Sequence, residues 1–135
     1  MDVRGQLQEV HQAAKSLLRL SDDIIADVLC AVADEMIAKA DSILKANELD
    51  LSRMDPANPK YDRLKLTHER LQCIAADMRN VAKLTSPVGK VLRETIRPNG
   101  LKIKQVSVPF GVIGIIYEAR PNVSFDVFSV CLRSH

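Results

Sequence analysis

Three polar side chains that could bind an anion or move a proton follow the longest apolar run of the chain. Residues 111–117 read GVIGIIY, and Glu118, Arg120 and Asn122 come directly after them. An unbroken apolar run of this length is typical of a strand covered on both faces in a parallel sheet. In open α/β sheets, ligands bind outside the carboxyl ends of the strands, often beside the N-terminus of a following helix. The pattern therefore predicts a ligand site at this point.

Arg120 and Asn122 are the main candidates within this site. Arg120 carries a planar guanidinium that suits a carboxylate or a phosphate, which makes it the candidate substrate-binding residue. The alternatives are that it pairs with Glu118 or lies in solvent. Asn122 has amide donors able to stabilise a developing oxyanion, and the alternative is an Asx turn or a lead-in to the helix. Gly111 and Gly114 do not form the GxGxxG pattern, so they are weak evidence for a phosphate loop.

The three cysteines indicate neither a metal site nor a disulfide framework. Cys30, Cys73 and Cys131 are far apart, form no CxxC pair and have no histidine at ligand spacing. Cys30 and Cys73 fall among apolar residues at helical spacing, so we expect reduced, buried thiols that pack as small hydrophobes. We expect Cys131 to pack in the same way. This cysteine usage favours the reducing cytoplasm.

The composition excludes several classes of protein. The chain has 135 residues, of which 47% are apolar and 27% charged, as in about one ordinary globular domain. A net charge of +2 with three Phe, two Tyr and no Trp offers neither the basic stripe nor the stacking platform of a nucleic-acid-binding protein. The longest uncharged run, 105–117, is interrupted by Pro109 and falls short of the ~20 residues that span a bilayer. The first twenty residues lack the apolar core of a signal peptide, so we expect no membrane span, no nucleic-acid partner and no secretion.

The first 84 residues are predicted to form a helical layer. Apolar residues recur at helical spacing over 3–18, 24–37, 43–49 and 64–82. Ser21 and Thr67 are predicted N-caps because their hydroxyl oxygens can accept a hydrogen bond from a free amide of the first turn. Asp41 and Ser42 are expected to interrupt the second helix, and the proline-containing residues 54–61 to form a loop.

The segment TSPVG at 85–89 ends the helical pattern, and strand-favouring residues follow. Residues 91–96 and 101–108 flank Asn99-Gly100, which predicts a hairpin with a two-residue turn because both residues tolerate positive φ. The alternation changes near Gln105, which predicts a bulge or a twist. After the apolar run, Ser124 is expected to cap a final helix. A buried parallel strand at 111–117 needs parallel neighbours reached through crossovers, so the chain is expected to be the front part of a larger α/β protein.

Several motifs together carry a family resemblance. They are DRLKLT at 62–67, PVG at 87–89, RPNGL at 97–101 and VPFGVIGIIYEARPNV at 108–123, with a looser match at ANELDL, 46–51. On these motifs the chain resembles the N-terminal portion of the gamma-glutamyl phosphate reductases, also called glutamate-5-semialdehyde dehydrogenases, of the aldehyde dehydrogenase superfamily. The resemblance covers nearly the whole chain and is most specific toward its C-terminus.

The resemblance implies an NADPH-dependent enzyme that reduces L-glutamyl 5-phosphate to L-glutamate 5-semialdehyde and releases phosphate, the second step of proline biosynthesis from glutamate. In that family a cysteine attacks the acyl phosphate, and the thioester then accepts hydride. By motif position Asn122 is the candidate oxyanion-hole donor, and the backbone of Ile116, Tyr117, Glu118 and Ala119 would lie along the cofactor. The family's nucleophilic cysteine has no counterpart in these residues, so we expect the chain alone to be inactive.

The expected fold class is α/β. Residues 1–84 form the helical N-terminal part, 85–108 the β-hairpin of an oligomerisation arm, and 109–135 the start of an NADP-binding domain. That start holds the first strand and helix of a Rossmann-like aldehyde dehydrogenase cofactor domain. By resemblance the complete enzyme is a cytoplasmic homo-oligomer with a small-molecule substrate. The alternative from another class is a non-catalytic module that binds a partner chain by strand addition.

Overall fold

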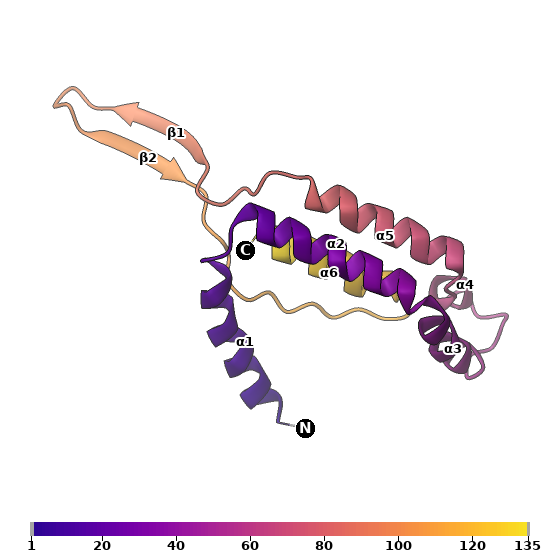
Figure 1. Cartoon of the computed structure of the whole chain (residues 1–135). Coiled ribbons are helices and arrows are strands. Elements are labelled where there is room, and N and C mark those ends of the chain that lie inside the picture. Colours follow the sequence, from indigo (N-terminus) through magenta and orange to yellow (C-terminus); the bar gives the residue numbers. More distant parts are fainter. Residues whose placement is uncertain (1, 135) are drawn as a thin grey trace.

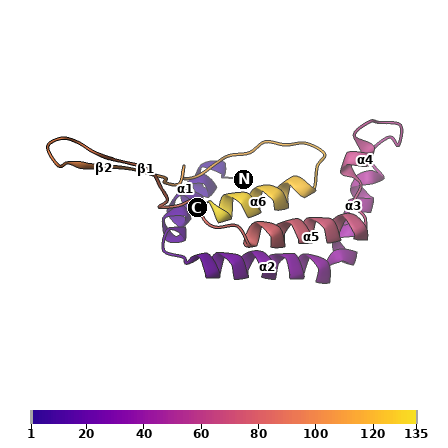
Figure 2. The same cartoon turned by 90° about the horizontal axis from the view of Figure 1, so that it is seen from above.

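The computed structural model describes residues 2–134, which form a layer of helices and one projecting hairpin. Its elements are α1 (Val3–Leu17), α2 (Asp22–Ala38), α3 (Ala40–Leu51), α4 (Tyr61–Leu64), α5 (His68–Ala82), β1 (Val91–Ile96), β2 (Lys102–Val106) and α6 (Asn122–Arg133). Helices α2, α5 and α6 lie side by side, while the hairpin extends away from them (Figures 1 and 2). Within the described chain, every helix is too short or too polar to cross a bilayer.

The core lies mainly between α2 and α5. One cluster of buried side chains comprises Ala33, Met36, Ala40, Leu71, Ile74, Ala75 and Met78, and a second comprises Ile25, Leu29 and Ala82. These positions follow the i, i+3, i+4 spacing of an amphipathic helix, so the helical layer is confirmed over this part of the sequence. By contrast, α1 has no buried residue.

Helix α6 has two buried polar residues, and one of them, Arg133, fastens it to this layer. Ser129, on the face toward the layer, is 1% exposed, and its hydroxyl donates to the Phe125 carbonyl oxygen at 2.7 Å. Arg133 is 8% exposed and donates from Nε to the carbonyl oxygen of Leu84 and from Nη1 to that of Asp22, the latter at 3.0 Å. Arg133 therefore ties the end of α6 to the start of α2 and to the residues just after α5.

Two of the three predicted helix caps are confirmed. The Ile24 amide donates to Ser21 Oγ at 3.4 Å, and the Arg70 amide donates to Thr67 Oγ1 at 3.1 Å. The prediction for Ser124 is wrong, because α6 already begins at Asn122 behind Pro121, without a side-chain cap. The interruption expected at residues 41–42 falls slightly earlier, at Lys39 between α2 and α3.

The hairpin is confirmed, but its turn differs from the prediction. The Gly100 amide donates to the Arg97 carbonyl oxygen at 2.8 Å, and the Arg97 amide donates to that of Leu101 at 2.9 Å. Within this turn only Gly100 has a positive φ, +81°. Pro98, Asn99 and Gly100 therefore form a three-residue loop, in which a type I turn is followed by a G1 bulge. The irregular pairing between Val91 and Arg93 lies opposite Gln105, where the bulge was expected.

The buried strand predicted at 111–117 is absent, and this is the main departure from the expected fold. Residues 108–119 belong to no strand and make no backbone–backbone hydrogen bond to the rest of the described chain. Ile113 is 52% exposed and Ile116 is fully exposed. A strand exists only through hydrogen bonds to a neighbouring strand, and the one sheet found in residues 2–134 is the hairpin itself. The structure therefore shows helices with a two-stranded antiparallel sheet, which is consistent with part of an α/β fold, and the Rossmann-like arrangement stays a prediction.

Candidate functional site

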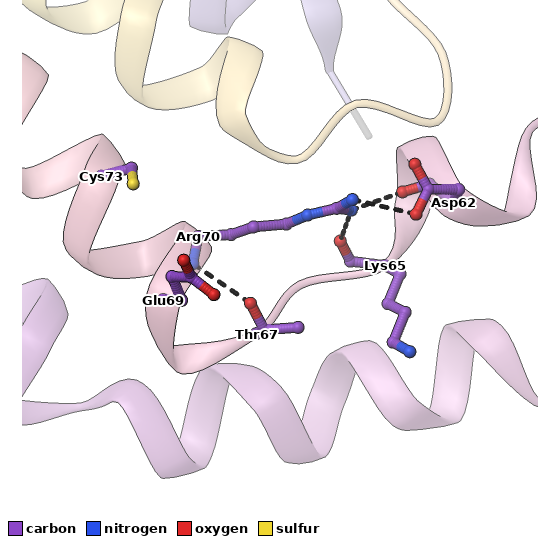
Figure 3. Close-up of a pocket in the computed structure, with 6 residues that line it drawn as sticks. All are labelled: Asp62, Lys65, Thr67, Glu69, Arg70 and Cys73. Atoms are coloured by element: carbon purple, nitrogen blue, oxygen red, sulfur yellow. Dashed lines mark hydrogen bonds and ion pairs between the residues drawn. The ribbon is translucent and has the colours of Figure 1, made fainter.

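An open groove brings together two of the motifs that carry the resemblance, DRLKLT and VPFGVIGIIYEARPNV. It has a volume of about 410 Å³ and lies between the segment from α4 through α5 and the start of α6. Its lining residues are Asp62, Arg63, Lys65, Leu66, Arg70, Cys73, Ile74, Asp77, Arg120, Asn122 and Asp126. A second hollow of about 370 Å³ shares four of these residues and adds Thr67 and Glu69 (Figure 3). Arg120 and Asn122 thus face a wall built from DRLKLT and α5.

Arg70 holds this wall together. Its Nη1 donates to the carbonyl oxygens of Asp62 and Lys65, and its Nη2 donates to Asp62 Oδ1 at 2.9 Å. Figure 3 shows the guanidinium reaching across from α5 to these acceptors, with the Thr67 cap at the base of the helix. Because both terminal nitrogens are engaged within the protein, Arg70 shapes the groove and is not its free anion ligand.

Asn47, on α3, supports the same wall from behind. Its side chain is 6% exposed. Nδ2 donates to the Leu64 carbonyl oxygen at 2.9 Å, and Oδ1 accepts from the Leu66 amide at 2.8 Å. One buried amide therefore satisfies two backbone groups in the extended link between α4 and α5, and it fixes the conformation of residues 64–66.

Glu118 and Ala119 lead the chain into the groove. Glu118 Oε2 pairs with Lys60 Nζ at 2.8 Å, and this hydrogen bond together with the lysine charge lowers the pKa of the Glu118 carboxyl. The alternative that Glu118 pairs with Arg120 is therefore wrong. Ala119 has φ of +50°, in the left-handed region that few non-glycine residues adopt.

Asn122 and Arg120 differ in their exposure and in their hydrogen-bond partners. Asn122 is half-buried, and its Nδ2 donates to Asp126 Oδ2 at 3.0 Å, one turn further along α6. Asn122 is the first residue of α6, which fits the alternative of a helix lead-in, and among residues 2–134 its second amide hydrogen and its Oδ1 have no hydrogen-bond partner. Arg120 is exposed, and its side chain makes no hydrogen bond or ion pair with another residue of 2–134, although its carbonyl oxygen accepts from the Val123 amide at 3.1 Å.

Cys73 corrects one sequence expectation. It is exposed and lines both hollows, whereas Cys30 and Cys131 are partly buried. Its position explains the difference, because Arg70, Cys73 and Asp77 share one face of α5 at i, i+3 and i+7 spacing, opposite the core face. That spacing is the signal by which Arg70 and Asp77 could have been found from sequence. Asn47 lies within ANELDL, but nothing local indicates its distant partners.

Comparisons with known proteins find close relatives of this chain. No family model matches the chain. Gamma-glutamyl phosphate reductase of Bacteroides thetaiotaomicron is 64% identical over 133 residues, which are 98% of this chain and 32% of that protein. The protein of that name from Parabacteroides distasonis is 61% identical over 99% of this chain. The chain spans about a third of the length of the curated relatives it matches.

Solved structures show the same likeness. The crystal structure of gamma-glutamyl phosphate reductase from Thermotoga maritima superposes with a TM-score of 0.91 at 29% identity, and it covers 99% of this chain and 33% of its own. The Saccharomyces cerevisiae structure of the same name gives 0.89, also at 29% identity. Sequence and fold therefore agree on one group of relatives. These are the gamma-glutamyl phosphate reductases, which the chain closely resembles over the third of their length that it spans.

Proposed function

We propose that this chain forms part of an enzyme that reduces L-glutamyl 5-phosphate with NADPH to L-glutamate 5-semialdehyde and releases phosphate. The observation that carries the proposal is the 64% identity to a gamma-glutamyl phosphate reductase over 98% of the chain. The alternative of a free-standing strand-addition module is not favoured, since the relatives described above all carry the reductase name.

The groove supports particular roles for its residues. Arg120 has an exposed guanidinium with no partner among residues 2–134, so it is suited to hold an anionic group of the substrate. Asn122 stands at the first turn of α6, where its free amide hydrogen and the helix N-terminus both favour a developing negative charge. The nucleophilic thiolate is proposed to come from outside these 135 residues.

Residues 116–119 fit a role beside the cofactor. Their backbone groups make no backbone–backbone hydrogen bonds within the described chain, so Ile116, Tyr117, Glu118 and Ala119 have donors and acceptors free for a nucleotide. When bound, NADPH supplies the hydride for the reduction. The contribution proposed for this chain is a backbone edge along which the cofactor lies.

The same proposal extends to the organisation of the complete enzyme. Residues 1–84 would be its helical N-terminal part, 85–108 the hairpin of an arm that joins subunits, and 109–135 the start of the NADP-binding domain. The hairpin's projection away from the helices is compatible with such an arm (Figure 1). We propose the cytoplasm as the compartment.

A segment exchange tests the proposed function. The corresponding third of the Bacteroides thetaiotaomicron enzyme is replaced by this chain, and phosphate-dependent oxidation of glutamate 5-semialdehyde with NADP is followed at 340 nm, alongside the unaltered enzyme and the isolated chain. We expect the exchanged enzyme to keep activity within about tenfold and the isolated chain to show none. An exchanged enzyme that folds but does not turn over contradicts the proposal.

Two variants of the exchanged enzyme, provided that it is active, test the roles proposed for Asn122 and Arg120. Asn122→Ala is expected to lower kcat by roughly 100-fold, the typical effect of removing one oxyanion donor. Arg120→Ala is expected to raise KM more than it lowers kcat, because it removes binding to a group that does not react. An unchanged kcat in Asn122→Ala would remove that residue from the mechanism.

A further inference from the structure

The charged residues of the groove divide into those held by the protein and those left free. Asp62 is bound by Arg70, and Asp126 accepts from Asn122. Asp77 also lines the groove, is exposed, and makes no side-chain hydrogen bond or ion pair with another residue of 2–134. Asp77 is thus the only lining carboxylate of the described chain that has no partner.

The cations of the groove divide in the same way. Arg70 is engaged by Asp62 and by two backbone carbonyls. Arg63, Lys65 and Arg120 line the groove without a side-chain partner in the described residues. The groove groups without a side-chain partner in the described residues are therefore one carboxylate on α5 and several cations, of which Arg120 lies on the opposite wall, just before α6. Figure 2 shows these two helices running side by side.

We propose that Asp77 binds the α-ammonium of an amino-acid substrate while Arg120 binds its α-carboxylate. This inference rests on the proposed function, because the substrate named there carries both groups at the end remote from the reacting carbonyl. A zwitterionic head requires one anion and one cation on facing surfaces, and Asp77 and Arg120 are the free pair that the two walls provide. Asp77 is then a specificity residue that selects substrates bearing the ammonium.

The competing explanation is that Asp77 is a solvated carboxylate on the polar face of α5. The two explanations differ in their dependence on the substrate. Loss of a charge-assisted hydrogen bond should weaken reaction only with substrates that carry the ammonium. A structural or general electrostatic effect of Asp77 should act on all substrates alike.

The test uses the exchanged Bacteroides thetaiotaomicron enzyme and two aldehydes. These are glutamate 5-semialdehyde and 5-oxopentanoate, which keeps the carboxylate and aldehyde but lacks the ammonium. The variant Asp77→Asn, which keeps the shape of the side chain, is compared with the exchanged enzyme without a substitution (the parent exchange). For each aldehyde the result is the ratio of the two kcat/KM values, in which the effect of the spontaneous cyclisation of the semialdehyde cancels. Asp27→Asn, at an exposed site on α2 outside the groove, is the matched control.

We expect Asp77→Asn to lower kcat/KM for the semialdehyde by roughly 10- to 100-fold, mainly through KM, and to leave 5-oxopentanoate within about twofold. The Asp27→Asn control should change neither. Equal losses with both aldehydes, or no loss with the semialdehyde, would overturn the role of Asp77 while leaving the proposed function intact. A parent exchange that is inactive with the semialdehyde would overturn the proposed function, and this inference with it.

Discussion

In the layer of α2, α5 and α6, apolar side chains pack against one another, whereas many of the equally apolar side chains of residues 108–119 are exposed. Leu29 and Leu71 are 0% exposed, but Val108 is 77% and Phe110 is 98% exposed. The backbone shows the same contrast, because the helices satisfy their own amides while this segment makes no backbone–backbone hydrogen bond. Local sequence is thus sufficient for the helices, while the extended segment depends on a neighbouring strand.

The largest expected effect compares a buried with an exposed apolar residue. Leu71→Ala should lower the free energy of unfolding by about 2–5 kcal/mol, because it removes a fully buried side chain and leaves a cavity. Ile113→Ala, at a residue that is 52% exposed, should change it by less than about 0.5 kcal/mol. Urea unfolding followed by circular dichroism measures both. Equal effects would show that residues 111–117 are buried in solution.

A smaller effect on the free energy of unfolding is expected from the buried side chain of Arg133, which bonds α6 to the rest of the layer. Arg133→Met keeps the apolar stem but leaves the Leu84 and Asp22 carbonyl oxygens without this donor, so we expect a loss of about 1–3 kcal/mol. Arg53→Met is the control, since Arg53 lies in an exposed ion pair with Asp50 at 3.9 Å and such pairs contribute little. A loss in the control as large as in Arg133→Met would argue against the fastening.

Asn47 allows a local test of the groove wall. Asn47→Ala removes one hydrogen bond to each of two backbone groups and should cost about 1–2 kcal/mol. Hydrogen exchange should show that the Leu66 amide exchanges faster in this variant. The increase in its rate should be larger than the increase for the amides of α2 in the core. Asn80→Ala, at an exposed position of α5, should leave that amide unaffected. Unchanged protection of Leu66 in Asn47→Ala would contradict the role of Asn47.

The smallest effect concerns the ion pair that leads into the groove. Lys60→Met should raise the pKa of Glu118 toward its ordinary value, as measured by NMR titration of the carboxyl. Because the folded pKa is lowered, the pair contributes at pH values above the ordinary carboxyl range, and its contribution is lost as the pH falls through the lowered pKa. Lys39→Met, which removes the separate pair with Glu35, should leave Glu118 unchanged. A Glu118 pKa that does not move in Lys60→Met would contradict the pairing.

The contrast between local and distant interactions explains which predictions from the sequence were confirmed. Ser21 and Thr67 were identifiable as caps because each bonds an amide three residues away. Ser124 was not, because its hydroxyl instead hydrogen-bonds that of Tyr117 across the bend before α6. Residues 111–117 have the composition of a buried strand, but composition does not supply the partner that burial requires.

For the candidate site, the sequence identified positions but not partnerships. Arg120 and Asn122 were found from their place after the apolar run, and they do line a groove. Asn47 was missed because its partners are recognisable only when α3 packs near residues distant in sequence, whereas Asp77 was missed although its spacing from Arg70 and Cys73 on α5 is visible in the sequence. The bonds of Asn47 join residues 17 and 19 positions apart, a separation that no helical or strand period encodes.

Hydrogen exchange of the backbone amides of residues 111–117 tests the central comparison most directly. It is measured in the isolated chain and in the Bacteroides thetaiotaomicron enzyme that carries this chain as its matching segment. We predict that these amides exchange freely in the isolated chain, while those of α2 and α5 are protected, and that they become protected in the exchanged enzyme. Protection of residues 111–117 in the isolated chain, or continued free exchange in the complete enzyme, would contradict the account.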